Sequence, residues 1–158
     1  MSNVIVIMGV SGSGKTSVGR QLGWSLEQPF YDADDFHPKS NIEKMKSGIP
    51  LTDQDRHPWL NRLALEIQGW EKEGGAVLAC SALKEDYRRT LSHKTDIQWI
   101  HLTASFDLIY QRMKQRNHFM KPELLQSQFD ALEVPNYGIH VASEQSVKGT
   151  VAKILSLL

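Results

Sequence analysis

Eight consecutive residues constrain this chain more than any other feature: Gly9-Val10-Ser11-Gly12-Ser13-Gly14-Lys15-Thr16. They match the full P-loop pattern, in which glycines let backbone amides approach phosphate oxygens. An uninterrupted apolar run, residues 4–8, precedes the loop, and a helical pattern over residues 16–26 follows it. That order turns a helix N-terminus toward an anion, which a merely flexible Gly/Ser turn would not do. The sequence therefore predicts a nucleotide-binding loop, with Lys15 between the β- and γ-phosphates and Thr16 at Mg²⁺.

The spacing of apolar residues predicts a parallel sheet that is covered on both faces. Residues 4–8 and 76–80 are continuous apolar runs, as in strands buried on both sides, and weaker candidates are residues 29–31, 97–102 and 138–142. Helical patterns alternate with these strands, most clearly in residues 60–67, 125–132 and 147–158. We therefore expect an α/β, three-layer P-loop fold with five parallel strands, in a single domain over residues 1–158.

Composition argues against several classes of function. Eighteen basic residues balance eighteen acidic ones, so no long-range field attracts nucleic acid or an anionic membrane. The apolar run at the start, residues 4–10, is much shorter than the ~20 residues of a membrane span. Cys80 is the only cysteine, which excludes a disulfide within the chain and suits a reducing compartment. We expect a cytoplasmic protein that binds neither nucleic acid nor membrane.

A P-loop alone does not separate an enzyme from a nucleotide-driven switch. Guanine-binding switches carry the motifs D-x-x-G and N-K-x-D. The first is absent here, and His93-Lys94-Thr95-Asp96 has the wrong first residue for the second. A kinase that uses ATP and Mg²⁺ is therefore favoured. A non-catalytic switch and a kinase for another small hydroxylated metabolite, such as shikimate, are the alternatives.

Two carboxylates follow the second predicted strand, at the edge of a parallel sheet where ligands bind. Asp32 and Asp34 are two residues apart, and alternate residues of a strand point the same way, so both can face the γ-phosphate. We predict that Asp34 accepts the proton of the acceptor hydroxyl and that Asp32 serves Mg²⁺. An acidic turn on the surface is the alternative.

Polar side chains near the same edge are candidates to bind a polyhydroxylated anion. We expect a helix that opens at His37-Pro38 and presents His37, Asn41 and Lys44 on one face. An adjacent apolar stripe, Ile42, Met45 and Ile49, is expected to pack inward. A solvated helix face is the alternative for the polar side chains.

Two further basic segments lie after the third strand. Lys84 and Arg88 fall at positions i and i+4 of a predicted helix, where they can share a face. Residues 112–121 contain four Lys or Arg and no acid. We interpret residues 112–122 as a lid that supplies Arg112 and Arg116 to ATP, with Arg116 at the transferring phosphoryl group. A nucleic-acid patch is the alternative, but it does not suit a neutral chain.

With these motifs in place, the chain resembles the small P-loop gluconokinases from residue 4 to the last helix. The strings that carry the resemblance include Tyr31-Asp32-Ala33-Asp34-Asp35, Asp53-Gln54-Asp55-Arg56 and Cys80-Ser81-Ala82-Leu83-Lys84. The resemblance implies ATP-dependent phosphorylation of D-gluconate to 6-phospho-D-gluconate, a fold like those of shikimate and nucleoside monophosphate kinases, and often a homodimer. The receptor for the acceptor's carboxylate is then expected among Lys44, Arg56, Lys84 and Arg88.

Overall fold

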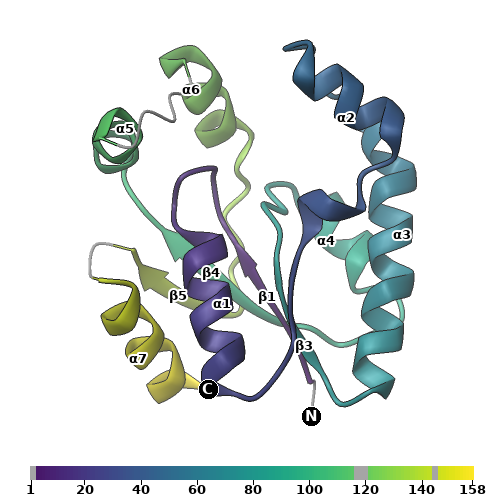
Figure 1. Cartoon of the computed structure of the whole chain (residues 1–158), viewed down its shortest axis with the longest axis vertical. Coiled ribbons are helices and arrows are strands. Elements are labelled where there is room, and N and C mark those ends of the chain that lie inside the picture. The colour runs from purple at the N-terminus through teal and green to yellow at the C-terminus, as the bar shows by residue number, and fades with distance from the viewer. Residues whose placement is uncertain (1–2, 116–120, 144–145) are drawn as a thin grey trace.

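The computed structural model describes residues 3–115, 121–143 and 146–158. Strands and helices alternate along the chain as the apolar spacing predicts (Figure 1). In chain order the elements are β1 (Val4–Met8), α1 (Lys15–Ser25), β2 (Phe30–Asp32), the 3₁₀ helix η1 (Ala33–Phe36), α2 (Lys39–Lys46), α3 (Asp53–Lys72), β3 (Ala76–Ala79), α4 (Glu85–Leu91), β4 (Gln98–Thr103), α5 (Phe106–Gln115), α6 (Pro122–Ala131), β5 (Ile139–Ala142) and α7 (Val147–Leu157).

The five strands form one parallel sheet in the order β2-β3-β1-β4-β5. β1 lies at the centre, where Val4 pairs with Ala76 of β3 and Ile5 pairs with Gln98 of β4. All five residues of β1 are buried, which explains why its sequence is apolar without alternation. The five predicted strands are confirmed. β2 lies one residue later than predicted, so that Asp32 ends the strand.

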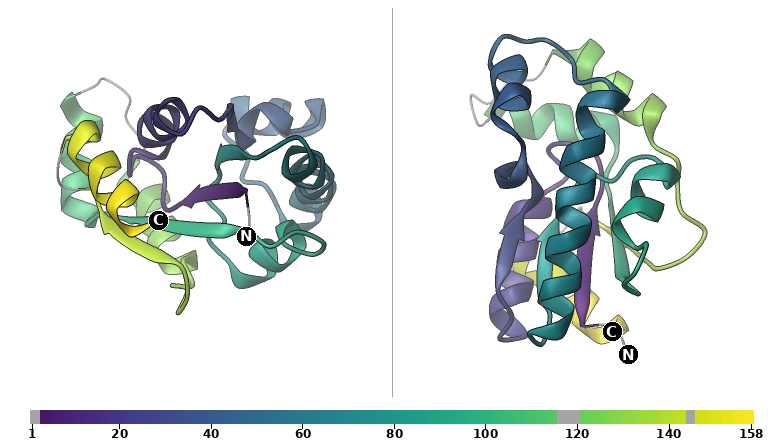
Figure 2. Two further views of the ribbon diagram at one scale, coloured as in Figure 1. Left: turned by 90° about the horizontal axis from the view of Figure 1, so that it is seen from below. Right: turned by 90° about the vertical axis from the view of Figure 1, so that its right-hand side faces the viewer.

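Helices cover both faces of the sheet and enclose two apolar cores (Figure 2). α1 and α7 pack on one face, where Leu22 and Ile154 meet Ile7 and Ile100 of the strands. On the other face α3 and α4 contribute Leu63, Ile67 and Leu91, which pack with Leu78 of β3. Fully burying one such side chain contributes roughly 1.5–3 kcal/mol, so these two layers fix the sheet and its edges.

Three helices lie beyond the carboxyl edge of the sheet, at the top of Figure 1. α5 and α6 pack against the P-loop there, because Ile109, Met113 and Leu125 form an apolar cluster with Val10. α2 has no such cover among the residues that the structure describes. Its apolar side chains are exposed to 36% (Ile42), 42% (Met45) and, just beyond the helix, 51% (Ile49), so the expectation that this stripe packs inward is wrong.

Two helix starts differ from the predicted ones. α2 begins at Lys39 rather than at His37, because the residue before a proline avoids the helical region, and His37 is extended with φ −66° and ψ 140°. Lys84 is also extended, as the N-cap of α4, so Lys84 and Arg88 do not share a helix face. Across the parts of the chain that the structure describes, we find no helix with the length and apolar character of a membrane span.

Candidate active site

The P-loop connects β1 to α1 and has the shape that phosphate binding requires. Gly14 caps α1 in the left-handed conformation, with φ 99° and ψ 14°. At Gly12, with φ 81°, a Cβ atom would lie 2.7 Å from side-chain carbons of both Ile109 and Met113. A side chain at Gly12 would therefore strain the backbone and push α5 away. The free amides at the start of α1 open toward the loop and fit an anion.

Lys15 reaches back across the P-loop, and its Nζ donates to the carbonyl oxygen of Val10 at 3.0 Å. Burial lowers the pKa of the Lys15 ammonium, while Cys80 and the carboxylates of Asp34 and Asp32 act in the opposite direction. The ammonium is thus placed beside the loop and within the electrostatic reach of the aspartate pair. Phosphate oxygens in the loop would stabilise its charge further.

Asp32 is held at the end of β2 by two hydrogen bonds. Thr16 Oγ1 donates to Asp32 Oδ2 at 3.0 Å, and the amide of Asp34 donates to Asp32 Oδ1 at 3.0 Å. Hard oxygen atoms of this kind are the ligands that Mg²⁺ takes, usually together with waters and phosphates. Within the described ranges no group of three or more His, Cys, Asp or Glu side chains could enclose a metal ion. One hydroxyl and one carboxylate at the loop therefore fit a nucleotide-bound Mg²⁺.

Asp34 lies in η1, not in the extended strand that its spacing from Asp32 suggests. It lines a cleft beside the P-loop, where partial loss of solvent and the neighbouring Asp32 carboxylate raise its pKa. The Lys15 ammonium has the opposite effect on that pKa. A carboxylate with a raised pKa in a cleft is suited to accept a proton.

The ring of His37 is oriented by a defined set of contacts. Asn41 Nδ2 donates to the carbonyl oxygen of Asp55 at 2.9 Å, which identifies that atom as the amide nitrogen. The same nitrogen lies 3.2 Å from His37 Nδ1, so Nδ1 is the acceptor and Nε2 carries the proton. Burial and the nearby Arg56 lower the pKa of His37, and Trp59 stacks on its ring at 4.1 Å. Neutral His37 therefore presents an Nε2–H donor, 4.0 Å from Asp34 Oδ1.

The cleft has a volume of about 310 Å³, at the lower end of the range for small-molecule sites. It brings together residues from η1, α2, α3, the segment after β3, α4 and α6. Four of the predicted acceptor-binding residues line it, namely Asp34, His37, Arg56 and Lys84. The other lining residues are Met45, Leu51, Trp59, Ser81, Ala82, Leu83, Tyr87, Gln128 and Ala131.

The other predicted acceptor-binding residues support the cleft from outside its lining. Lys44 Nζ is bonded to both carboxylate oxygens of Asp55, at 2.9 and 2.8 Å. This bond and the backbone amide of Thr52 lower the pKa of Asp55 to about 2. Asn41 also bonds to Asp55, as described above. Lys44 and Asn41 therefore attach α2 to the start of α3.

Arg88 is fully buried and occupied by the fold. Its guanidinium donates to the carbonyl oxygens of Ala82 and Glu133, both at 2.6 Å, and lies 3.0 Å from Glu85 Oε2. These contacts join the segment after β3 to the segment after α6. The predicted role of Arg88 as an acceptor ligand does not match this placement, because the N–H groups of its guanidinium already bond to Ala82, Glu133 and Glu85.

One side chain of the predicted lid region, that of Arg112, connects to the P-loop indirectly. Arg112 donates to Ser143 Oγ at 2.9 Å and to the Ser143 carbonyl, and Ser143 Oγ donates to the carbonyl of Ser13. Arg116 falls in residues 116–120, outside the described residues. The structure thus places Arg112 behind the loop, at its α5 side.

Gln128 and Tyr87 line the cleft although sequence reasoning gave them no role. Gln128 Oε1 accepts from the amide of Ser11 at 2.7 Å, and its Nε2 donates to Ser11 Oγ at 2.9 Å. These two hydrogen bonds join α6 to the P-loop. No local pattern marks Gln128, which is 117 residues from Ser11. Tyr87 stands three residues after Lys84, and this spacing is the signal from which its place beside Lys84 in the cleft could have been predicted.

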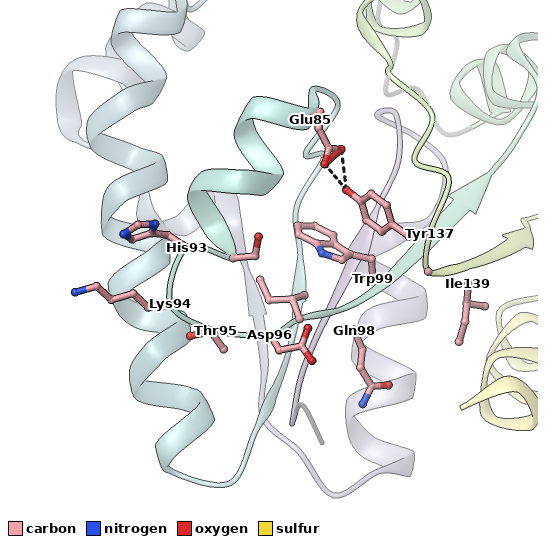
Figure 3. Close-up of a pocket in the computed structure, with 12 residues that line it drawn as sticks. Glu85, His93, Lys94, Thr95, Asp96, Gln98, Trp99, Tyr137 and Ile139 are labelled. Atoms are coloured by element: carbon pink, nitrogen blue, oxygen red, sulfur yellow. Dashed lines mark hydrogen bonds between the residues drawn. The ribbon is translucent and has the colours of Figure 1, made fainter.

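A larger cavity, of about 850 Å³, runs along β4 between α4 and residues 137–139 (Figure 3). Its upper wall is formed by Glu85 and Tyr137, whose hydroxyl bonds to the two Glu85 carboxylate oxygens at 2.9 and 2.8 Å. None of its lining residues belongs to the P-loop or to the aspartate pair. The smaller cleft is the candidate active site, because two of its lining residues connect it to the P-loop: Gln128 bonds to Ser11, and Asp34 interacts electrostatically with Lys15.

Comparisons with known proteins agree with this geometry. The family model for shikimate kinase matches residues 11–137. The Xenopus tropicalis protein named "Probable gluconokinase" is 46% identical over 174 residues, covering 98% of this chain and 88% of that protein. The thermoresistant gluconokinase of Escherichia coli (strain K12) is 39% identical, covering 99% and 93%. The crystal structure of a gluconokinase from Sinorhizobium meliloti 1021 is similar with a TM-score of 0.88 at 38% identity, covering 98% and 90%.

Proposed function

Because the chain belongs to the gluconokinase family, we propose that it transfers the γ-phosphoryl group of ATP to D-gluconate, forming ADP and 6-phospho-D-gluconate. The protein is a kinase with a P-loop fold. One observation carries the choice of acceptor: a single cleft combines the carboxylate of Asp34 with the cations Arg56 and Lys84. A linear sugar acid has a hydroxyl at one end and a carboxylate at the other, and the cleft offers a partner for each.

The cations and the phenol of the cleft are proposed to bind the carboxylate of gluconate. Arg56 and Lys84 lie over the ring of Tyr87, at 5.8 and 5.7 Å from its centre. The Nε2–H group of His37 is a donor for a hydroxyl oxygen along the sugar chain. In this pose the C6 hydroxyl reaches Asp34, which interacts electrostatically with Lys15 of the P-loop.

Asp34 is proposed to act as the base. It accepts the proton of the C6 hydroxyl while the oxygen forms a bond to the γ-phosphorus. The bond from that phosphorus to the β,γ-bridging oxygen breaks, and ADP leaves with the electron pair. Lys15 stabilises the charge on the phosphate oxygens. Because the transition state of phosphoryl transfer is loose, correct positioning contributes more to the rate than deprotonation does.

Thr16 and Asp32 are proposed to hold Mg²⁺, directly or through water. When it is bound, Mg²⁺ neutralises negative charge on the phosphate oxygens. Support comes from the hydroxyl and carboxylate oxygens of these residues, which lie 3.0 Å apart at the end of the P-loop. The second oxygen of Asp32 accepts from the amide of Asp34, which keeps the carboxylate fixed.

We also propose that the chain is a single kinase domain in which residues 112–122 form a lid. The first residues of this segment, 112–115, form the end of α5, its last residue begins α6, and Gln128 of α6 contacts the P-loop. Arg116 would reach the transferring phosphoryl group, and Arg112, held through Ser143 behind the loop, would support ATP binding from the same side. A cationic lid supplies positive charge beyond that of Lys15.

Cellular context is a further part of the proposal. Cys80 is buried, and burial raises the pKa of its thiol to about 12, so it behaves as a core residue rather than a nucleophile. A single buried thiol suits the cytoplasm. The resemblance to gluconokinases makes a homodimer the expected assembly, which sedimentation of the purified protein would test.

Coupled measurement of ADP release tests the proposed function. We expect turnover with D-gluconate, little with glucose, which lacks the carboxylate, and little with shikimate. Lys15→Ala should fold, with a wild-type melting temperature, and lose nearly all turnover. Comparable kcat/KM values for glucose and gluconate would contradict charge recognition by the cleft. Faster turnover of shikimate would reassign the acceptor, and wild-type kcat in Lys15→Ala would refute the P-loop assignment.

A further inference from the structure

The two cations of the cleft already have a carboxylate partner within the protein. Asp53 Oδ1 lies 3.7 Å from Arg56 Nη1 and 3.8 Å from Lys84 Nζ. Tyr87 Oη donates to the same oxygen atom at 2.5 Å. Arg56, Lys84 and Tyr87 line the cleft, whereas Asp53 lies outside its lining. Three groups that line the cleft therefore converge on one carboxylate oxygen.

The local fold explains only the contact with Arg56, which lies three residues after Asp53 on α3, and not those with Lys84 and Tyr87. The N-terminus of α3 is capped by Thr52 and Asp55, whose reciprocal hydrogen bonds measure 3.1 and 2.9 Å. Asp53 occupies the first helical position, and its side chain is 68% exposed. An acid in the first turn interacts favourably with the helix dipole wherever its side chain points. The helix dipole therefore does not explain why the side chain of Asp53 lies against residues of the cleft.

We propose that Asp53 is an internal counter-ion, which holds Arg56 and Lys84 in the empty cleft and is displaced from them by the carboxylate of the substrate. Asp53 thereby sets how strongly the cleft selects an acid over a neutral sugar. This inference rests on the proposed function for the identity of the anion. It adds a specificity-determining residue that competes with the substrate.

Charge balance gives the direction of the effect. With Asp53 the cluster of two cations carries a net charge of one, and without Asp53 it carries two. The hydrogen bond from Tyr87 and the charge of Lys84 lower the pKa of Asp53, so the carboxylate stays ionised at neutral pH. A substrate carboxylate must replace contacts that Asp53 already makes, and it is repelled by the like charge. Both effects weaken binding of an acid and leave binding of a neutral sugar unchanged.

Asp53→Asn tests the proposal, with Asp86→Asn as the matched control. Asp86 is also a first-turn acid, and it is paired with an arginine three residues later, at 3.2 Å from Arg89. Neither Asp86 nor Arg89 lines the cleft. In Asp53→Asn we expect the KM for D-gluconate to fall by about 3- to 10-fold, since each exposed ion pair is weak. The kcat value and the KM for ATP should not change, and Asp86→Asn should match the wild type.

Added sodium chloride provides a second readout. Because the unmasked cations attract the substrate through solvent, the KM of Asp53→Asn should rise more steeply with salt than that of the wild type. A higher KM or a lower kcat in Asp53→Asn would overturn the proposal, because Asp53 would then be positioning the cations. Equal decreases of KM in Asp53→Asn and Asp86→Asn would also overturn it, because net charge alone would explain them. Asp53→Ser repeats the test should the asparagine variant lose its wild-type melting temperature.

Failure of the proposed function would be seen separately, as absence of gluconate turnover by the wild-type enzyme. In that case sodium acetate serves as the probe, with sodium chloride at matched ionic strength as reference. Acetate should raise the melting temperature of Asp53→Asn more than that of the wild type. An equal effect on the two proteins would overturn the counter-ion role whichever acceptor the kinase uses.

Discussion

Asp32 and Asp34 show how two identical side chains, two residues apart, acquire different chemistry. Asp32 accepts hydrogen bonds from Thr16 and from the amide of Asp34, which hold its carboxylate in place. Asp34 lines the cleft, where partial loss of solvent and the charge of Asp32 raise its pKa. The fixed carboxylate suits a metal ligand, and the one with the raised pKa suits a base.

Substitution of these two residues should separate their roles. In Asp34→Asn we expect kcat to fall by roughly 10²–10⁴-fold with little change in ATP binding, because the amide keeps the shape but not the basicity. Asp32→Asn should instead raise the Mg²⁺ concentration needed for half-maximal rate. Steady-state rates over a Mg²⁺ series measure both effects. If only Asp34→Asn shifts the Mg²⁺ dependence, the two roles are exchanged.

Residue roles could be predicted where a local pattern reflects the chemistry. The P-loop is such a case, because phosphate geometry requires its glycines and its lysine at fixed spacing. Arg56 and Arg88 are the opposite case. Both are arginines near the same edge of the sheet. Arg88 differs because it is buried and bonds to carbonyl oxygens that are distant in sequence, such as that of Glu133. The contact of Asp53 with Lys84 joins segments about 30 residues apart and has no local signal.

At the scale of elements, one buried side chain of α4, that of Arg88, connects the helix to two neighbouring segments. The guanidinium of Arg88 satisfies the carbonyl oxygens of Ala82 and Glu133. Tyr137 and Glu85 complete the network, with Arg88 Nε lying 3.0 Å from the tyrosine hydroxyl. These contacts hold the start of α4, and with it Lys84, against the segment that leads to β5.

Arg88→Met should therefore destabilise the protein by about 3 kcal/mol, because buried carbonyls lose their donors and Glu85 loses its partner. Arg89→Met is the control one residue away. Arg89 is exposed and paired with Asp86 at 3.2 Å, so its loss should cost less than about 1 kcal/mol. Urea unfolding measures both changes in the free energy of unfolding. Equal destabilisation by the two variants would show that the buried network does not support the fold.

Periodicity predicted which segments form helices better than it predicted what their faces contact. The spacing of Leu63 and Ile67 in α3 reports burial correctly, because a sheet lies beneath that helix. The spacing of Ile42 and Met45 in α2 is just as regular, yet both are exposed. The apolar stripe can be recognised in a single sequence. Whether another layer covers that stripe cannot, because this depends on where the helix lies relative to the sheet.

For the whole molecule, a buried histidine should make stability depend on pH. His101 on β4 is 4% exposed, and its Nδ1 lies 3.2 Å from Nδ1 of His140 on β5. Burial, followed by the charges of His140 and Arg88, lowers the pKa of His101 from 6.5 to about 4. Between these two values the unfolded chain binds more protons than the folded one. The free energy of unfolding therefore decreases as the pH falls.

A shift of this size corresponds to a loss of about 3 kcal/mol between neutral pH and pH 4. His101→Asn should flatten this part of the pH profile, because asparagine can hydrogen-bond to His140 but does not titrate. The exposed His93 provides the control, and His93→Asn should keep the wild-type slope. Urea unfolding at a series of pH values measures all three proteins. The same slope in His101→Asn as in the wild type would assign the acid sensitivity to other groups.

The global architecture was accessible from the sequence because each strand is short, apolar and separated from the next by a helix. Parallel pairing follows from that alternation, and it is confirmed for every neighbouring pair of strands. The cleft was accessible only in part. Its residues come from η1, α2, α3, α4 and α6, whose mutual distances depend on packing that no local spacing encodes.

The central position of β1 also has a consequence for synthesis. This strand is made first, yet its neighbours β3 and β4 begin at Ala76 and Gln98. At roughly 5–20 residues per second, a ribosome needs about 4–14 s to add the roughly 70 residues that precede the first partner. During that interval the nascent chain carries a five-residue apolar segment that no later strand has yet joined. The newborn protein therefore passes through a period in which this segment can pair with other chains rather than with its own sheet.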